Sequence, residues 1–347
     1  MKIFLDESHC REQLRPFTQT RHVADIRIGI LTIREKWALL TGYEIVTTAP
    51  GTSSDCININ VQFLPEADNY AQIIESAISK DSLTPPPHIN ILQYPWQIFQ
   101  FNDRALRTDF EILTKNRQSA PIEETNHCIS EQAIFIEEGA VVSHSILNAS
   151  TGPIYIGKNA TVMEGSMIRG PFSLGKDSVL KMGSKVYGAT TIGPGCLAGG
   201  EIKNSVLFEF SNKAHDGYLG DSVIGAWCNL GAGTSNSNVK NTGGEVKFQL
   251  NETPDLISAG NKAGLLMADY SRAAINTSFN TGTVVGVCCN IFGETYPPKH
   301  IPDFTWGRNR YEFDKAIRDI DNWKKMKGQS ITENETALLK KLYQHIK

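Results

Sequence analysis

The residues with the clearest capacity for chemistry lie close together between positions 212 and 238. This stretch contains His215, Tyr218 and Asn238 among glycines and small polar residues. An imidazole titrates near neutral pH, so it suits a general base that takes a proton from an attacking group. Two lysines upstream, Lys185 and Lys203, carry the charge that binds phosphate. Taken singly, His215 is better explained as a cap on a turn, and each lysine as a solvated surface residue.

A repeat of six residues must position these side chains. From Ile156 to Ala198 an aliphatic or small residue recurs at every sixth position, eight times without a break. Period six matches neither a helix nor an alternating strand. It fits a coil of triangular cross-section, in which each side is a short strand and the stacked coils bury a continuous core. The unbroken run favours this architecture over a Gly-rich β-sandwich.

Three regions of the chain differ in pattern. Residues 1–125 alternate short apolar runs with helical periodicity, which predicts a small α/β domain. The repeats predict a parallel β-helix over residues 126–293, with an insert at about 240–264. Residues 294–347 form a C-terminal loop and two amphipathic helices, the second opened by a capping box at 332–335. We expect these helices to cap the open end of the coils or to pack on a neighbouring subunit.

The polar segment resembles the acetyltransferase half of the bacterial bifunctional GlmU family, N-acetylglucosamine-1-phosphate uridylyltransferase and glucosamine-1-phosphate acetyltransferase. Members read approximately K-A-G-H-L-T-Y-L-G-D, then N-I-G-A-G-T, then C-N-Y-D. The residues that match without a gap are His215, Tyr218–Asp221, Leu230–Thr234 and Asn238. The resemblance covers roughly residues 130–293, and it implies that the parallel β-helix is left-handed.

The resemblance also implies a role for each matching residue. The general base of the family falls on His215, which would deprotonate a sugar amine as that amine attacks a thioester. The Glu-x-Lys of the family falls on Glu201 and Lys203, and its phosphate-binding arginine falls on Lys185. The residues that would position the sugar are Tyr218 and Asn238.

The ligands and assembly of the family follow from the same resemblance. The co-substrate it implies is acetyl-CoA or another acyl-CoA, and the acceptor is an amino sugar phosphate or a nucleotide sugar. Residues 267–293 match the coenzyme A-binding coils of the family only loosely. Because active sites in this family form between neighbouring prisms, the resemblance implies a homotrimer.

A second resemblance lies near the N-terminus. The segment Leu14–Arg21, L-R-P-F-T-Q-T-R, is similar to the L-x-P-L-T-x-T-R-P-K that follows the phosphate loop of sugar nucleotidyltransferases. It implies nucleotide contacts for Arg15, Thr18 and Arg21. That loop normally closes on phosphates with glycine N–H groups, whereas residues 9–13 contain no glycine. We therefore expect a truncated, degenerate nucleotidyltransferase domain, which would need Mg²⁺ only if it is active.

Composition excludes several other classes of protein. The formal net charge is −3 and no basic run occurs, which argues against a nucleic-acid partner. No stretch reaches the roughly 20 apolar residues of a membrane span, and the N-terminus does not read as a signal peptide, so we expect a cytoplasmic protein without a membrane partner. The seven cysteines form no CxxC pair, so we expect no metal site.

Three functions remain open on the sequence. The preferred one is acyl transfer to an amino sugar phosphate or nucleotide sugar. A sugar-1-phosphate nucleotidyltransferase is the alternative, against which the missing glycines argue. The third is a non-catalytic protein that binds sugar nucleotides, against which the intact cluster around His215 argues.

Overall fold

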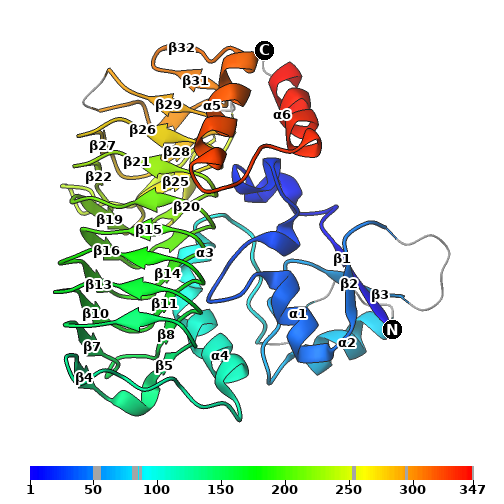
Figure 1. Ribbon diagram of the computed structural model, residues 1–347. Coiled ribbons are helices and arrows are strands. Elements are labelled where there is room, and N and C mark those ends of the chain that lie inside the picture. Colours follow the sequence, from blue (N-terminus) through cyan, green and yellow to red (C-terminus); the bar gives the residue numbers. More distant parts are fainter. Residues whose placement is uncertain (50–55, 80–84, 86–87, 252–254, 294–295, 346–347) are drawn as a thin grey trace.

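The structure has three parts: a short α/β region, a β-solenoid of stacked parallel coils, and two C-terminal helices (Figure 1). The predicted fold class is therefore confirmed, while the left-handedness of the coil stays a prediction. This computed structural model describes residues 1–347 except 50–55, 80–84, 86–87, 252–254, 294–295 and 346–347.

The α/β region is built on a small parallel sheet of order β2-β1-β3. Its strands are β1 (Lys2–Asp6), β2 (Glu44–Val46) and β3 (Cys56–Asn60). Its helices are α1 (Ile33–Thr41), α2 (Tyr70–Ile78), α3 (Gln97–Gln100) and α4 (Asn102–Thr114). The segment that resembles nucleotidyltransferases folds as three short 3₁₀ helices, η1 (Arg11–Leu14), η2 (Phe17–Gln19) and η3 (Val23–Asp25).

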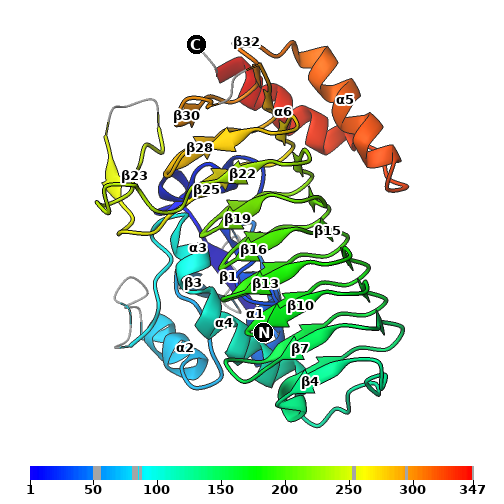
Figure 2. The same cartoon turned by 90° about the vertical axis from the view of Figure 1, so that its left-hand side faces the viewer.

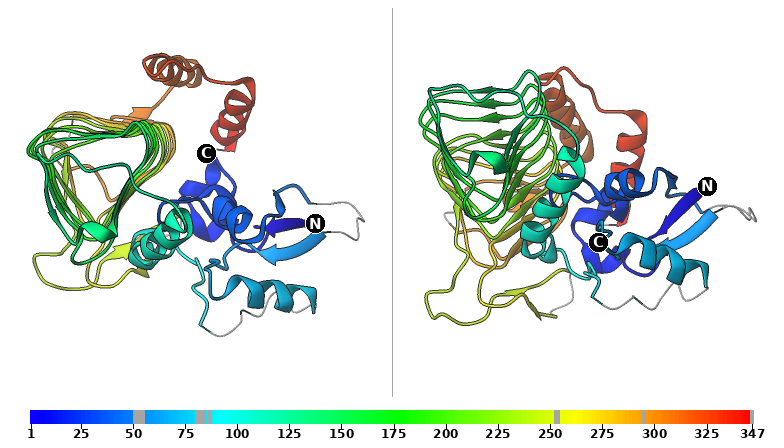
Figure 3. Two further views of the ribbon diagram at one scale, coloured as in Figure 1. Left: turned by 60° about the horizontal axis from the view of Figure 1, so that its bottom comes forward. Right: turned by 90° about the horizontal axis from the view of Figure 1, so that it is seen from below.

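The solenoid has three faces, each formed by a sheet of mainly parallel strands, and they give it a triangular cross-section (Figure 3). The six-stranded sheet contains β4 (His127–Ile129), β7 (Ile146–Asn148), β10 (Met167–Arg169), β13 (Lys185–Tyr187), β16 (Glu201–Lys203) and β19 (Tyr218–Gly220). The nine-stranded sheet contains β5 (Ile134–Ile136), β8 (Ile154–Ile156), β11 (Phe172–Leu174), β14 (Thr190–Ile192), β17 (Val206–Leu207), β20 (Val223–Ile224), β25 (Leu265–Met267), β28 (Thr283–Val285) and β30 (His300–Ile301).

The third face is the ten-stranded sheet. Its strands are β6 (Val141–Val142), β9 (Thr161–Val162), β12 (Val179–Leu180), β15 (Leu197–Ala198), β18 (Asn212–Lys213), β21 (Asn229–Leu230), β26 (Arg272–Ala273), β29 (Asn290–Ile291), β31 (Thr305–Trp306) and β32 (Asn309–Arg310). A separate parallel pair is formed by β22 (Ser235–Asn236) and β27 (Ser278–Phe279). Because β30 and β31 join these sheets, stacked strands continue beyond residue 293, where the predicted β-helix ends.

The six-residue repeat forms the core of the solenoid. All eight residues of the unbroken run are at most 2% exposed: Ile156, Val162, Ile168, Leu174, Leu180, Val186, Ile192 and Ala198. Each coil pairs in parallel with the next, so the side chain at a given position stacks on its equivalent one coil away. The predicted inward position of these residues is confirmed.

The C-terminal helices, α5 (Phe313–Lys325) and α6 (Glu333–His345), pack along one corner of the solenoid. This corner carries Phe210, Trp227 and Tyr270, all at positive φ in the left-handed region. Their rings project outward: Phe210 stacks on Trp227 at 4.4 Å, and Tyr270 donates a hydrogen bond to Glu335 in α6 at 2.9 Å. Packing on these aromatic side chains offsets the cost of the strained backbone, and it draws the helices to the corner rather than across the open end.

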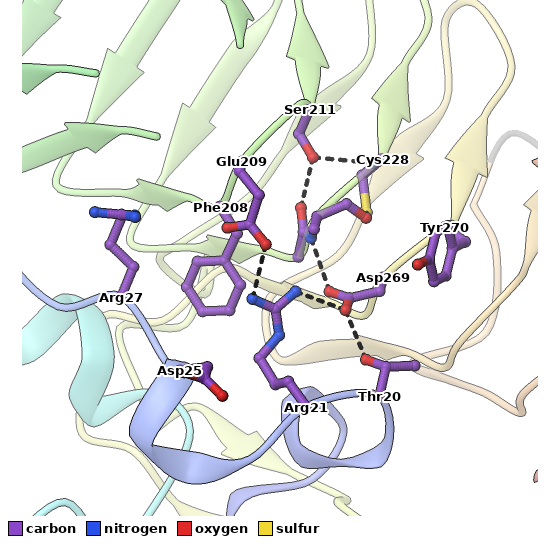
Figure 4. A network of polar contacts seen from close by, with 12 residues as sticks. Thr20, Arg21, Asp25, Arg27, Phe208, Glu209, Ser211, Cys228, Asp269 and Tyr270 are labelled. Carbon is purple, nitrogen blue, oxygen red and sulfur yellow. Dashed lines mark hydrogen bonds and ion pairs between the residues drawn. The ribbon is translucent and has the colours of Figure 1, made fainter. Parts of the chain in front are cut away.

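The α/β region docks on the nine-stranded sheet through buried polar contacts. Asn102 of α4 accepts a hydrogen bond from Gly29 N at 2.8 Å and donates one to Ala189 O at 2.9 Å. Further along the solenoid, Arg21 pairs with Glu209 at 3.1 Å and with Asp269 at 2.6 Å (Figure 4). These bonds tie segments far apart in the sequence into one body.

The insert at about 240–264 packs on the α/β region. It contains the antiparallel strands β23 (Lys247–Phe248) and β24 (Ile257–Ser258). Phe248 stacks on Trp96 at 5.4 Å, and Gln100 donates a hydrogen bond to Ala259 O at 3.0 Å. The described part of the insert therefore connects the solenoid to the α/β region. The six-stranded sheet, in contrast, has no helix of the described chain in front of it (Figure 2).

We predict that Arg21→Met lowers the free energy of unfolding by about 3–5 kcal/mol, because it leaves the buried carboxylate of Asp269 and the half-buried carboxylate of Glu209 without their counter-charge. Denaturant unfolding measures this loss. Arg15→Met is the matched control in the same segment, since its partner Glu12 is 71% exposed and such a pair is worth at most about 1 kcal/mol. Equal losses in the two variants would contradict the prediction.

Candidate functional site

The outward face of the six-stranded sheet brings predicted site residues together. In the register of β13, β16 and β19, Lys185 lies beside Glu201, and Glu201 lies beside Tyr218. Since neighbouring strands are about 5 Å apart, the row from Lys185 to Tyr218 spans about 10 Å. The residues between them in each strand point inward and are buried: Val186, Ile202 and Leu219. Residues separated by 33 positions in the sequence thus share one small surface.

A second row on the same face joins Tyr187 and Lys203, which are paired in the register. The Tyr187 hydroxyl donates a hydrogen bond to Glu201 at 2.6 Å, and the Lys203 ammonium lies 5.6 Å from the Tyr187 ring. The bond to the Glu201 carboxylate, with partial burial, raises the pKa of Tyr187 to about 12. Tyr187 was not among the predicted site residues. Its spacing of two from Lys185 on one strand is the signal that would have identified it.

Lys185 and Lys203 keep their charges available. Among the described residues, no ion pair involves either of these two side chains, although the Glu201 carboxylate lies on the neighbouring position. Two ammonium groups that form no ion pair on this face can bind an anion, and phosphate is a common ligand of lysine in such a setting.

Asp221 organises the end of β19. It is only 4% exposed, and its carboxylate accepts hydrogen bonds from Asn204 at 2.6 Å and from Asn238 at 2.5 Å. Burial, and then the negative charge of Asp221, raise the pKa of the nearby Tyr218 phenol well above its ordinary value. Asn204 and Asp221 were not predicted as site residues. Their role depends on a turn that the repeat alone does not specify.

Tyr218 lies flat along its own strand. A side chain added at Gly220 would come within 2.2 Å of the Tyr218 hydroxyl oxygen, so the ring lies over Gly220 and would have to move if this residue had a side chain. The phenol therefore points along the sheet face toward Asp221 and Asn238.

His215 lies on the turn that leads into β19, and its side chain is exposed. The turn rests on the coil before it, where a side chain at Gly200 would meet His215 O at 2.7 Å. It also supports both neighbouring coils: Gly217 O accepts from Glu201 N at 3.2 Å, and Asp216 O accepts from Gly233 N at 3.0 Å. The histidine is thus carried on a backbone that the adjacent coils hold in place.

The three N-terminal candidates do not converge on one surface. Arg15 pairs with Glu12 at 2.8 Å, and the buried Thr18 hydroxyl donates to Arg11 O at 2.6 Å. The two terminal nitrogens of the Arg21 guanidinium pair with the carboxylates of Glu209 and Asp269, while its buried Nε has no hydrogen-bond partner (Figure 4). Nucleotide binding by Arg15, Thr18 and Arg21 stays a prediction, and the contacts seen for them are within the protein.

In the part of the chain that the structure describes, no three His, Cys, Asp or Glu side chains are grouped as metal ligands. The helices of this part are also too short or too polar to cross a membrane.

Comparison with known proteins finds two kinds of relative. Residues 2–78 and 58–118 match the model of a family described as sugar nucleotidyl transferase. The chain is 34% identical over 86 residues to the bifunctional protein GlmU of Methanococcus maripaludis, which covers 25% of this chain and 20% of the relative. It is 37% identical over 93 residues to a bifunctional sugar-1-phosphate nucleotidylyltransferase/acetyltransferase of Sulfurisphaera tokodaii, covering 26% and 23%. The predicted GlmU-like resemblance, with a shortened nucleotidyltransferase region, is confirmed.

The chain spans about a fifth of the length of the curated relatives it matches. Two solved structures share limited similarity. The polySia-specific acetyltransferase NeuO is 13% identical with a TM-score of 0.28, covering 59% of this chain and 94% of NeuO. The Arabidopsis UDP-N-acetylglucosamine acyltransferase is 15% identical with a TM-score of 0.22, covering 65% and 90%. The fold assignment rests on the strands of the chain itself rather than on these two proteins.

We predict that Glu201→Gln lowers the pKa of Tyr187 from about 12 toward the ordinary value of about 10, because a neutral amide no longer stabilises the protonated phenol. An NMR titration of the tyrosine ring carbons measures it. Tyr155 is the internal control: it donates to Glu137 at 2.5 Å and should keep its raised pKa in this variant. An unchanged pKa of Tyr187 would show that its hydroxyl is not hydrogen-bonded to Glu201 in solution.

Proposed function

We propose that this protein is an acyltransferase that moves an acyl group from an acyl-CoA to the amino group of a phosphorylated or nucleotide-linked sugar. The observation that carries the proposal is the parallel register that gathers Lys185, Glu201 and Tyr218 beside the turn of His215. The similarity to a relative that is named as a bifunctional nucleotidylyltransferase and acetyltransferase supports it.

Each side chain has a defined part in this proposal. Lys185 and Lys203 would hold the phosphate of the acceptor, and Glu201 would accept hydrogen bonds from the sugar. Tyr218 and Asn238 would orient the ring. These are the roles that the residue types support at their observed positions.

The proposed reaction needs one base. The amine nitrogen of the acceptor forms a bond to the thioester carbonyl carbon, and the carbon–sulfur bond breaks. His215 takes the proton that the nitrogen loses and returns it to the departing thiolate. No Mg²⁺ enters this step, and acetyl-CoA or another acyl-CoA is consumed as a co-substrate.

A second function has one specific observation in its favour, the family match to sugar nucleotidyl transferases in the α/β region. Against it, residues 9–13 lack the glycines that would present N–H groups to a nucleoside triphosphate, and Arg21 is committed to Glu209 and Asp269. Release of pyrophosphate from UTP or dTTP with a sugar-1-phosphate and Mg²⁺ would favour this function. Binding of a sugar nucleotide with neither activity would favour a non-catalytic protein.

We predict that His215→Ala lowers the rate of acyl transfer by about 10²–10⁴-fold, the usual contribution of a general base. The affinity for the sugar phosphate should change little, because Lys185 and Lys203 are intact. A screen of acetyl-CoA with amino sugar phosphates and UDP- or dTDP-linked amino sugars supplies the substrate for this assay. His144→Ala, at another exposed solenoid histidine, is the control and should keep full activity. If the His215→Ala variant keeps full activity, His215 is not the general base and is only part of the turn.

We also propose a homotrimer, since the exposed row on the six-stranded sheet is too open to enclose a sugar within one subunit. Light scattering should then give a mass near three times that of the 38.3 kDa chain. A monomer at micromolar concentration would contradict this assembly.

A further inference from the structure

Among the inward positions of the described solenoid strands, which the repeat reserves for aliphatic or small side chains, one carries a charged residue, Lys213. Lys213 follows Asn212 in β18, and the register places it above Ala198 in the stack of inward residues. The inward neighbours in this column are Val162, Leu180, Ala198, Leu230 and Ala273. Lys213 is only 1% exposed. A lysine in such a place loses its hydration, so it needs a compensating interaction.

The ammonium group of Lys213 is compensated by hydrogen bonds at the turn of His215. It donates one hydrogen bond to Gly199 O at 3.0 Å and another to the carbonyl oxygen of His215 itself. These two carbonyls belong to stacked turns of successive coils. Lys213 therefore joins the turn that carries the histidine to the coil below, from inside the solenoid.

Backbone hydrogen bonds from Glu201 N to Gly217 O and from Gly233 N to Asp216 O also hold this turn, and Lys213 adds a side-chain hydrogen bond at the carbonyl of His215 itself. A side chain at Gly199 would meet Ala214 O at 2.6 Å, so the turns already touch backbone to backbone. The small side chain of Ala198 leaves room for the lysine stem in the coil below. Burial, opposed only by the charge of Asp216, lowers the pKa of Lys213 to about 8, which agrees with a site of high desolvation cost.

We propose that Lys213 is a positioning residue that fixes the backbone of the His215 turn from the solenoid core. It does not touch the acceptor or the acyl donor. It acts through His215, whose side chain direction depends on the carbonyl that Lys213 holds. The inference rests on the proposed function, because it assigns Lys213 to the support of the proposed base.

The test replaces the lysine with an apolar side chain of similar length. In Lys213→Met the core remains filled and the cost of burying a charge disappears, so the melting temperature should stay equal or rise. The turn should loosen. The amides of Glu201 and Gly233, which donate to the turn carbonyls, should then exchange their hydrogens about tenfold faster. With substrate, kcat should fall by about ten- to a hundredfold while KM changes less than about twofold.

Lys327→Met is the matched control. Lys327 also donates to a solenoid carbonyl, Gly195 O at 2.6 Å, but at the corner beneath the C-terminal helices, where its second hydrogen bond goes to the outward side chain of Asn212 at 3.0 Å. This variant should leave the exchange at Glu201 and Gly233 unchanged. Lys213→Leu provides a second apolar variant in case methionine is not accommodated.

The outcomes separate the inference from the proposed function. Unchanged exchange at Glu201 and Gly233 in both Lys213 variants overturns the inference. So does a loss of stability with faster exchange along the whole solenoid, which would make Lys213 a general core residue. If the wild-type protein transfers no acyl group but the exchange responds as expected, the turn is held by Lys213 and only the proposed function fails.

Discussion

The hydrogen-bonded register between successive coils is the constraint on which the rest of this molecule depends. Lys185 N donates to Gly200 O at 2.8 Å, and Glu201 N donates to Gly217 O at 3.2 Å. These bonds set how far each coil is displaced from the next. A slip of one residue would turn every outward side chain into the core. The register therefore fixes the core and the outer rows of the six-stranded sheet at the same time.

This constraint explains why the sequence predicts so much of the fold. A coil that repeats with constant register must place an aliphatic or small residue at the same point in each turn. The run from Ile156 to Ala198 shows this requirement in the sequence. The outward-facing rows of side chains are harder to predict from the sequence, because exposed positions need not carry the same type of residue in each coil. Tyr187 lies in the row of Lys203, but nothing in its own type distinguishes it from an ordinary strand residue.

The parts outside the repeat were harder to predict for a different reason. The corner aromatic residues adopt a left-handed backbone that propensity disfavours. The C-terminal segment packs on their rings: the Lys324 ammonium of α5 lies 5.0 Å from the Trp227 ring, and that of Lys327, just after α5, lies 6.0 Å from the Phe210 ring. Tertiary packing of this kind is not encoded in any local pattern. The insert behaves similarly, since the stack of Trp96 on Phe248 joins segments about 150 positions apart in the sequence.

In the N-terminal segment, the guanidinium of Arg21 could bind either a phosphate or a carboxylate. A guanidinium binds carboxylate and phosphate by the same charged hydrogen bonds. In this protein Arg21 bonds Asp269, and Asp269 in turn caps Ala226 N at 2.7 Å in the preceding coil. An arginine in the segment that resembles a nucleotide-binding motif thus holds the α/β region to the solenoid. Binding a phosphate there would require breaking these pairs and leaving the buried carboxylate of Asp269 without its counter-charge, which is costly.

The covered faces in turn determine where chemistry can occur. The α/β region and the insert pack against the nine-stranded side, while α5 and α6 occupy the corner beside the ten-stranded sheet (Figures 1 and 2). The six-stranded sheet keeps the Lys185 row accessible, and below it Ile146 and Met167 are 41% and 43% exposed. A neighbouring subunit on these residues would close the open side of the cluster without disturbing the register that builds it.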